Sequence, residues 1–164
     1  MKTVNVVLAG LGGQGVIKAS DVLSDAAFRA GYDVKKSEIH GMSQRGGSVC
    51  SDVRFGRTVL SPMVTPGEAD ILVVLAADQI EVNRSQLRPG GVLITPDMID
   101  AARLLNRKSL NIALLGVLSR HVEIALESWL AAIQGCFPEN LQIANRQAFE
   151  AGRQIPMKQP RNPA

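Results

Sequence analysis

The chain has 164 residues, of which 46% are hydrophobic and 20% are charged, a composition typical of one soluble globular domain. Its net charge of +3 comes without a dense run of Lys or Arg, which argues against nucleic acid as a partner and suits a phosphate-bearing small molecule. No hydrophobic run approaches the roughly 18 residues of a membrane-spanning helix, and the N-terminus lacks a signal-peptide layout. We therefore expect a cytoplasmic protein with no membrane partner.

Apolar runs and helical periodicities alternate along the chain. The β-branched run from Val4 to Ala9 predicts a buried strand, and apolar residues spaced three and four apart from Val16 to Ala30 predict a helix that Gly31 ends. Further strands are expected over 32–39, 48–55, 71–75 and 92–95, and further helices over 78–87, 97–106, 111–121, 126–136 and 138–151. This order predicts an α/β, Rossmann-like fold with three layers: an open, mostly parallel sheet flanked by helices, followed by a helical C-terminal part.

Neither an internal repeat nor a flexible linker divides the sequence. We therefore expect one domain over residues 1–152. The remaining residues, 153–164, contain three prolines and few apolar side chains, which predicts a disordered tail.

A glycine-rich connection, Gly10 to Gly15, follows the first predicted strand and fits G-x-G-x-x-G. Glycines permit a tight turn and let backbone amides approach an anion, and the N-terminus of the next helix adds a partial positive charge. Glu38 lies about 20 residues further on, where a nicotinamide-binding domain holds its ribose. Three interpretations stay open: an NAD(P) or FAD site, a site for another phosphate-bearing ligand, and a purely structural turn.

A second polar, glycine-rich segment lies between the second and third predicted strands, from Lys36 to Val49. Arg45 stands beside two glycines and could present its guanidinium to a phosphate or carboxylate. His40 is expected to hydrogen-bond within this loop, since the sequence offers it neither a nucleophile nor a metal partner. The two cysteines, Cys50 and Cys136, are far apart and do not make the set of about four thiolates that an iron–sulfur cluster needs. No catalytic residue and no metal ligand are expected in this chain.

These two segments carry a family resemblance. GLGGQGV at 10–16 and SEIHGMSQRGGSV at 37–49 resemble the two motifs of the gamma-type domain of 2-oxoacid:ferredoxin oxidoreductases, the second in its indolepyruvate beta-subunit form. The resemblance continues through DVRFG at 52–56, SPMV at 61–64, GEADILV at 67–73 and NIALLGVLS at 111–119, and covers most of residues 3–152. The sequence departs from the family between Pro96 and Leu110, where a longer segment is usual. The shorter segment is expected to change one edge of the sheet and the contact that this edge makes with a partner subunit.

The resemblance implies a subunit of an enzyme that oxidatively decarboxylates a 2-oxoacid, reduces ferredoxin and forms an acyl-coenzyme A, with indolepyruvate as the substrate in the most similar form. It further implies a large alpha subunit that carries thiamine diphosphate, Mg and [4Fe-4S] clusters, so that the chain is not active alone. Coenzyme A is then the co-substrate expected on this chain. The residues expected to face it are Gly12, Gly13, Gln14 and Gly15 in the first loop and Ser43, Gln44, Arg45 and Gly46 in the second.

Other functions remain open beside this one. The chain could serve another 2-oxoacid, such as pyruvate, 2-oxoglutarate or a branched-chain acid. It could also be a non-catalytic interaction module that forms a homodimer when isolated, or a small NAD(P)-binding protein.

Overall fold

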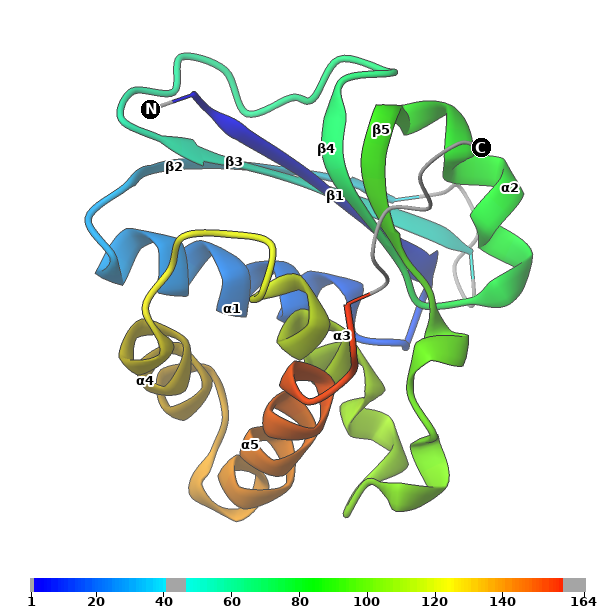
Figure 1. Ribbon diagram of the computed structural model, residues 1–164, viewed down its shortest axis with the longest axis vertical. Coiled ribbons are helices and arrows are strands. Elements are labelled where there is room, and N and C mark those ends of the chain that lie inside the picture. The colour runs from blue at the N-terminus through cyan, green and yellow to red at the C-terminus, as the bar shows by residue number, and fades with distance from the viewer. Residues whose placement is uncertain (1, 41–46, 158–164) are drawn as a thin grey trace.

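The computed structural model describes residues 2–40 and 47–157. Five strands form one sheet in the order β2-β3-β1-β4-β5 (Figure 1). Their bounds are β1 Val4–Leu11, β2 Asp33–His40, β3 Ser48–Gly56, β4 Ala69–Val74 and β5 Leu87–Ile94. The main helices are α1 Val16–Arg29, α3 Leu110–Leu118, α4 Leu126–Cys136 and α5 Glu139–Arg153, and α2 Ile80–Asn83 is a single turn.

The sheet is mixed, with four strands in one direction and β3 in the other. β1 pairs in parallel with β4, and β4 with β5, whereas β3 is antiparallel to both β1 and β2. The reversal follows from the short connection between β2 and β3, because a parallel crossover needs a dozen or more residues. The α/β, mostly parallel architecture is confirmed, with this one reversed strand inserted between β2 and β1.

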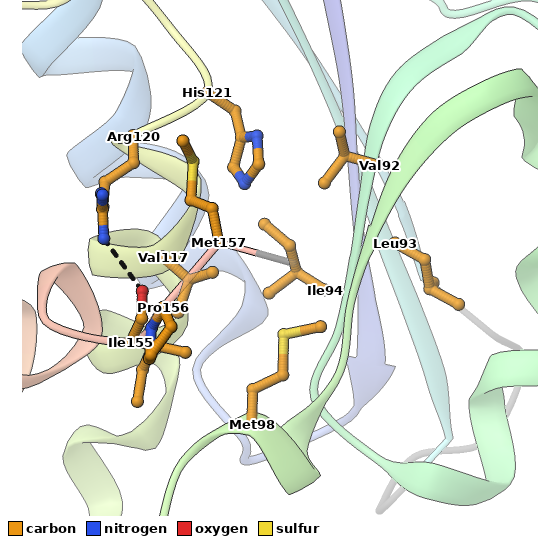
Figure 2. Close-up of a pocket in the computed structure, with 10 residues that line it drawn as sticks. All are labelled: Val92, Leu93, Ile94, Met98, Val117, Arg120, His121, Ile155, Pro156 and Met157. Carbon is orange, nitrogen blue, oxygen red and sulfur yellow. Dashed lines mark hydrogen bonds between the residues drawn. The ribbon is translucent and has the colours of Figure 1, made fainter. Parts of the chain in front are cut away.

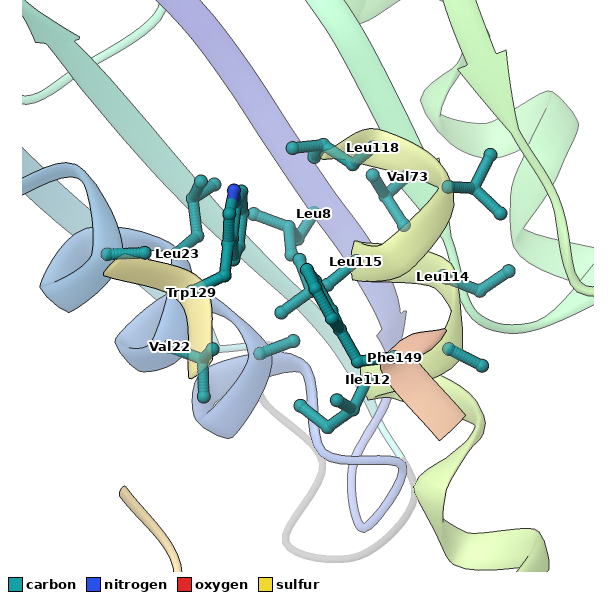
Figure 3. Packing of buried hydrophobic residues seen from close by; sticks show 14 of the residues in the cluster. Leu8, Val22, Leu23, Val73, Ile112, Leu114, Leu115, Leu118, Trp129 and Phe149 are labelled. Carbon is teal, nitrogen blue, oxygen red and sulfur yellow. The ribbon is translucent and has the colours of Figure 1, made fainter. Parts of the chain in front are cut away.

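Most of the helical mass lies on one face of the sheet (Figure 1). α1 and α3 contact the strands, while α4 packs on α1 and α5 packs on α3. Their apolar side chains enclose the main core, in which the rings of Trp129 and Phe149 lie 5.3 Å apart and are both fully buried (Figure 3). The opposite face carries a smaller cluster, where Val7 and Leu72 of the sheet are covered by Val64 and Ile80.

The prediction of a helix over 97–106 is wrong. Three separate 3-10 turns occupy this region: η3 Pro96–Met98, η4 Ala101–Arg103 and η5 Arg107–Ser109. The side chain of Asp100 accepts a hydrogen bond from Ala102 N, and that of Asn106 accepts one from Lys108 N. Such local side-chain bonds compete with helical hydrogen bonding, so the chain turns repeatedly instead of forming a helix.

One strand boundary also differs from the prediction. The strand expected over 92–95 begins earlier, at Leu87 of β5, and its register against β4 shifts between the pairs Ala69–Leu87 and Ile71–Val92. The domain boundary at 152 stays a prediction, and beside it α5 ends at Arg153 and Ile155 packs against the main core. Disorder of the tail stays a prediction for residues 158–164, which lie outside the described residues.

Candidate functional site

The glycine loop connects the carboxyl end of β1 to the N-terminus of α1. Gly13 and Gly15 have φ angles of 86° and 82°, in the left-handed region that favours glycine. A Cβ on Gly13 would meet no atom within 4 Å, whereas a Cβ on Gly15 would clash with the side chain of Asn111. The backbone at Gly13 is therefore open to a ligand, and Gly15 is required for close packing against α3.

Gln14, which we expected to face the ligand, is used by the loop itself. Its Oε1 accepts a hydrogen bond from Leu11 N at 2.7 Å, and its Nε2 donates to Leu75 O at 3.5 Å. The Gly12 N–H donates to Gly47 O at 2.8 Å. All four residues predicted in this loop still border open space beside α1, and Gly13 and Gly15 do so on both sides of the loop.

The second loop begins and ends beside the first. Leu11 at the end of β1 is paired with Ser48 at the start of β3, and His40 at the end of β2 is paired with Val49. Ser43, Gln44, Arg45 and Gly46 lie outside the described residues, so their place at the site stays a prediction. Since Gly47 bonds to Gly12, the C-terminal end of the second loop touches the glycine loop directly.

Two cavities border the glycine loop and share Gly13, Gly15 and Lys18. The first, of about 410 Å³, lies between the loop, the first turn of α1 and Val49 of β3. The second, of about 360 Å³, lies on the other side, and its lining includes Lys108, Asn111 and Asn145. A phosphate-bearing molecule laid across the loop could occupy both cavities.

The second cavity lies where the N-terminal ends of α1, α3 and α5 converge, which gives it a positive character. Asn111 Nδ2 donates to Gly15 O at 3.0 Å and joins α3 to the glycine loop. Lys18 Nζ donates to Cys136 O at 3.2 Å and lies 5.6 Å from the centroid of the Phe137 ring. With Lys108 in the same lining, two ammonium groups are available to an anion.

Sequence reasoning missed Lys18, Lys108 and Asn111 as site residues. Lys18 is 90 residues from Lys108 in the chain, and only the packing of α3 beside α1 brings them to one cavity. Lys18 lies in the first turn of α1, directly after the glycine motif, and this position is the one local signal that could have found it.

The geometry argues against a nicotinamide site. A doubly wound dinucleotide domain places the acidic residue at the end of the strand next to the first strand. Glu38 lies instead on β2, which β3 separates from β1, and its carboxylate binds Lys36 Nζ at 2.8 Å. Glu38 therefore forms an ion pair on the edge strand, away from the place where it would bind the ribose of a nicotinamide cofactor.

Neither cysteine has the character of a reactive or metal-binding thiol. Burial, with the negative charge of Asp52 adding to it, raises the pKa of Cys50 to about 11, and burial also raises the pKa of Cys136. Residues 2–40 and 47–157 contain no group of three His, Cys, Asp or Glu side chains placed to hold a metal ion. No helix within these ranges is long and apolar enough to span a membrane.

Comparison with known proteins gives one consistent family. The family described as "Pyruvate ferredoxin/flavodoxin oxidoreductase" matches residues 5–155. The subunit IorB of the indolepyruvate oxidoreductase of Thermococcus kodakarensis is 47% identical over 97 residues, which are 58% of this chain and 47% of that protein. The IorB subunit of Pyrococcus horikoshii is 46% identical over the same coverage. The matched stretch thus spans about half the length of these curated relatives.

Solved structures share the fold. The 2-oxoglutarate:ferredoxin oxidoreductase of Magnetococcus marinus, with 2-oxoglutarate, coenzyme A and succinyl-CoA bound, superposes with a TM-score of 0.82 at 21% identity and covers 94% of this chain and 31% of its own. The gamma subunit of a keto/oxoacid ferredoxin oxidoreductase from Geobacter sulfurreducens gives a TM-score of 0.79 at 24% identity and covers 94% of this chain and 97% of its own.

Proposed function

Since the chain belongs to the pyruvate ferredoxin/flavodoxin oxidoreductase family, we propose that it is a subunit of a 2-oxoacid:ferredoxin oxidoreductase that binds coenzyme A for the complex. The observation that carries this proposal is the glycine loop with a cavity on either side, at the N-terminus of α1. The reaction converts a 2-oxoacid to an acyl-coenzyme A and CO2, and the electrons pass to ferredoxin.

Coenzyme A has the chemistry that this rim can recognise. Its diphosphate is placed at the first turn of α1, where no side chain caps the helix and the backbone N–H groups face outward. Its 3′-phosphate is placed near Lys18 and Lys108, whose charges strengthen hydrogen bonds to phosphate. Arg45 of the second loop is proposed to contact the same ligand. This chain would therefore bind and orient the acyl acceptor, and it would leave carbon–carbon bond cleavage to its partner.

The partner is proposed to be a large alpha subunit. The [4Fe-4S] clusters are assigned to it, because this sequence has two separated cysteines where a cluster requires about four thiolates. Thiamine diphosphate and Mg are assigned to it from the family to which the chain belongs. The thiamine cofactor supplies the decarboxylation when bound to that subunit. Residues of this chain then hold the thiol of coenzyme A in reach of the acyl group.

Indolepyruvate is the proposed 2-oxoacid. Support comes from the 44–47% identity to four IorB subunits, compared with 32% and 37% to two ketoisovalerate oxidoreductase subunits. Co-expression with the large subunit and assay of dye reduction on indolepyruvate, ketoisovalerate and pyruvate tests this choice. Equal or greater turnover of either of the latter two would reassign the substrate.

The coenzyme A site is tested in the assembled enzyme. Lys108→Ala and Arg45→Ala should each raise the KM for coenzyme A about tenfold or more, because a phosphate loses a charge-assisted hydrogen bond. The KM for the 2-oxoacid should not change. Lys35→Ala is the matched control, since Lys35 lies on the edge strand and pairs with Asp33 at 3.1 Å. An unchanged KM for coenzyme A in both variants would remove this rim from the coenzyme site.

Purification separates this proposal from a non-catalytic homodimer. A brown complex that contains the large subunit is expected when both chains are co-expressed. A colourless self-dimer that never captures the large subunit would favour the interaction module instead.

A further inference from the structure

A further cavity, separate from the two at the glycine loop, lies at the other end of α3. It has a volume of about 220 Å³ and lies between β5, the C-terminal end of α3 and residues 155–157 (Figure 2). α3 has nine residues, so its two ends are roughly 14 Å apart at 1.5 Å per residue. Asn111, which bonds to the glycine loop, is at the first end, and Arg120 and His121 follow the last.

The walls of this cavity are apolar and come from three parts of the chain. Val92 and Ile94 of β5, Val117 of α3 and Met98 surround a common space, and Ile155 and Met157 close one side (Figure 2). Ile94 is fully buried and Val117 is 8% exposed, so the inner end is shielded from solvent. Two methionine thioethers in one lining favour an aromatic ring, because sulfur makes favourable contacts with ring edges.

The polar groups at this cavity are basic. Arg120 Nη1 donates to Arg153 O at 3.0 Å and to Ile155 O at 2.9 Å, which fixes the C-terminal segment over the cavity. These bonds leave the Nε and Nη2 donors of the guanidinium without a hydrogen bond to the described residues. His121 lies at the mouth and points between Val92 and Met157 (Figure 2). Among residues 2–40 and 47–157, no carboxylate lines the cavity.

We propose that this cavity binds a small aromatic carboxylate, with the ring between the two methionines and the carboxylate at Arg120 and His121. The volume is below the roughly 300 Å³ at which pockets for drug-sized molecules begin, so the ligand is a one- or two-ring acid. Arg120 supplies the charge. Burial and the Arg120 charge lower the pKa of His121, so at neutral pH its imidazole is uncharged and contributes a hydrogen bond.

Binding is measured on the isolated full chain, without coenzyme A or partner, so the result is independent of the proposed function. Indole-3-acetate is added while the methionine methyl signals are followed by NMR. We expect saturable shifts of Met98 and Met157 with a dissociation constant of about 1 mM or tighter. Indole-3-acetamide, which keeps the shape and lacks the charge, should bind at least about tenfold more weakly, since it loses a charge-assisted hydrogen bond.

Two substitutions in β5 distinguish binding in this cavity from nonspecific binding to the protein surface. Val92→Phe fills the space and should abolish the shifts. Leu93→Phe is the matched control, because Leu93 borders the cavity but its side chain points away from it (Figure 2) and packs with the cluster on the opposite face of the sheet. His121→Ala, at the exposed mouth, should weaken binding about fivefold, the loss expected for one hydrogen bond.

Several results would overturn the proposal. If no saturable shifts are seen at indole-3-acetate concentrations up to about tenfold above the expected dissociation constant, a small-molecule site is excluded. Equal affinity for the acid and the amide would exclude recognition of the carboxylate. Unchanged binding in Val92→Phe would place the ligand elsewhere.

Discussion

Polar side chains that line the second cavity divide into those that also hold the glycine loop and those that do not. Gln14 and Asn111 belong to the first kind, because Gln14 accepts a hydrogen bond from Leu11 N and Asn111 donates one to Gly15 O. Lys108 belongs to the second. The motif could not predict this division, since the amide of Gln14 bonds to the loop's own backbone and Asn111 approaches from 96 residues away.

Replacement of Gln14 by alanine should destabilise the protein. The Leu11 N–H would lose its acceptor, and a partly buried donor without a partner costs about 1–3 kcal/mol. We expect the free energy of unfolding, measured by urea denaturation, to fall by about that amount. Gln154→Ala, at an exposed position after α5, should stay within about 0.5 kcal/mol of the wild type. Equal stability of both variants would contradict the structural role of Gln14.

The Cys50 thiol should resist alkylation. With its pKa raised to about 11, roughly one thiol in a thousand is ionised at pH 8, so iodoacetamide should react about 100-fold more slowly than with an ordinary thiol of pKa near 8.5. Because the pKa is raised, the rate should increase as the pH rises toward 11. Mass spectrometry of the native protein checks this, with the urea-unfolded chain as the fast-reacting control. Rapid labelling of native Cys50 at pH 8 would show that the thiol is not buried as described.

At the scale of elements, two glycines set how closely α3 and α5 approach. A Cβ on Gly152 would overlap Ala113 O, and a Cβ on Gly116 would overlap Phe149 O. The two helices therefore meet backbone to backbone, which holds Phe149 in the core. Glycine in a helix usually costs about 1 kcal/mol relative to alanine, and close packing here offsets that cost.

Gly152→Ala should destabilise the fold by at least about 2 kcal/mol, because an overpacked helix contact forces the backbones apart. Gly135→Ala in α4 is the control. A Cβ there would approach only the ends of the Arg29 and Asp25 side chains, at 3.3 and 3.8 Å, so we expect no loss and up to about 1 kcal/mol of gain from helix propensity. Thermal unfolding of both variants tests the contrast, and a stable Gly152→Ala protein would refute the close contact.

Periodicity alone was sufficient to predict α1, α4 and α5 and the existence of all five strands. It could not give the direction of β3, because strand direction depends on the length of the connection and not on the side chains of the strand. It also failed at 97–106, where Asp100 and Asn106 bind local backbone N–H groups. Apolar spacing there resembles a helix, but turn-forming side chains decide the conformation.

At the scale of the whole molecule, the two faces of the sheet are protected unequally. The helical face holds most of the buried apolar residues, and Phe149 is central to it. The other face is covered by a small cluster that includes Val64, with the exposed Leu60 and Met63 in the same connection. Stability should therefore depend mainly on the helical side.

Phe149→Ala should lower the free energy of unfolding by about 3–5 kcal/mol, as expected when a large buried ring is removed. Phe28→Ala is the matched control, since Phe28 is 71% exposed and its loss should cost less than about 0.5 kcal/mol. Far-UV circular dichroism in urea gives both values. Similar costs for the two substitutions would mean that the helical layer does not dominate stability.

The one tryptophan of the chain, Trp129, is fully buried, and its indole Nε1 has no hydrogen-bond partner in the described structure. An indole in such dry surroundings emits at short wavelength, and contact with water shifts that emission to the red. The protein therefore carries its own optical probe of whether α4 remains docked, and any loosening of this layer during subunit assembly can be followed without a label.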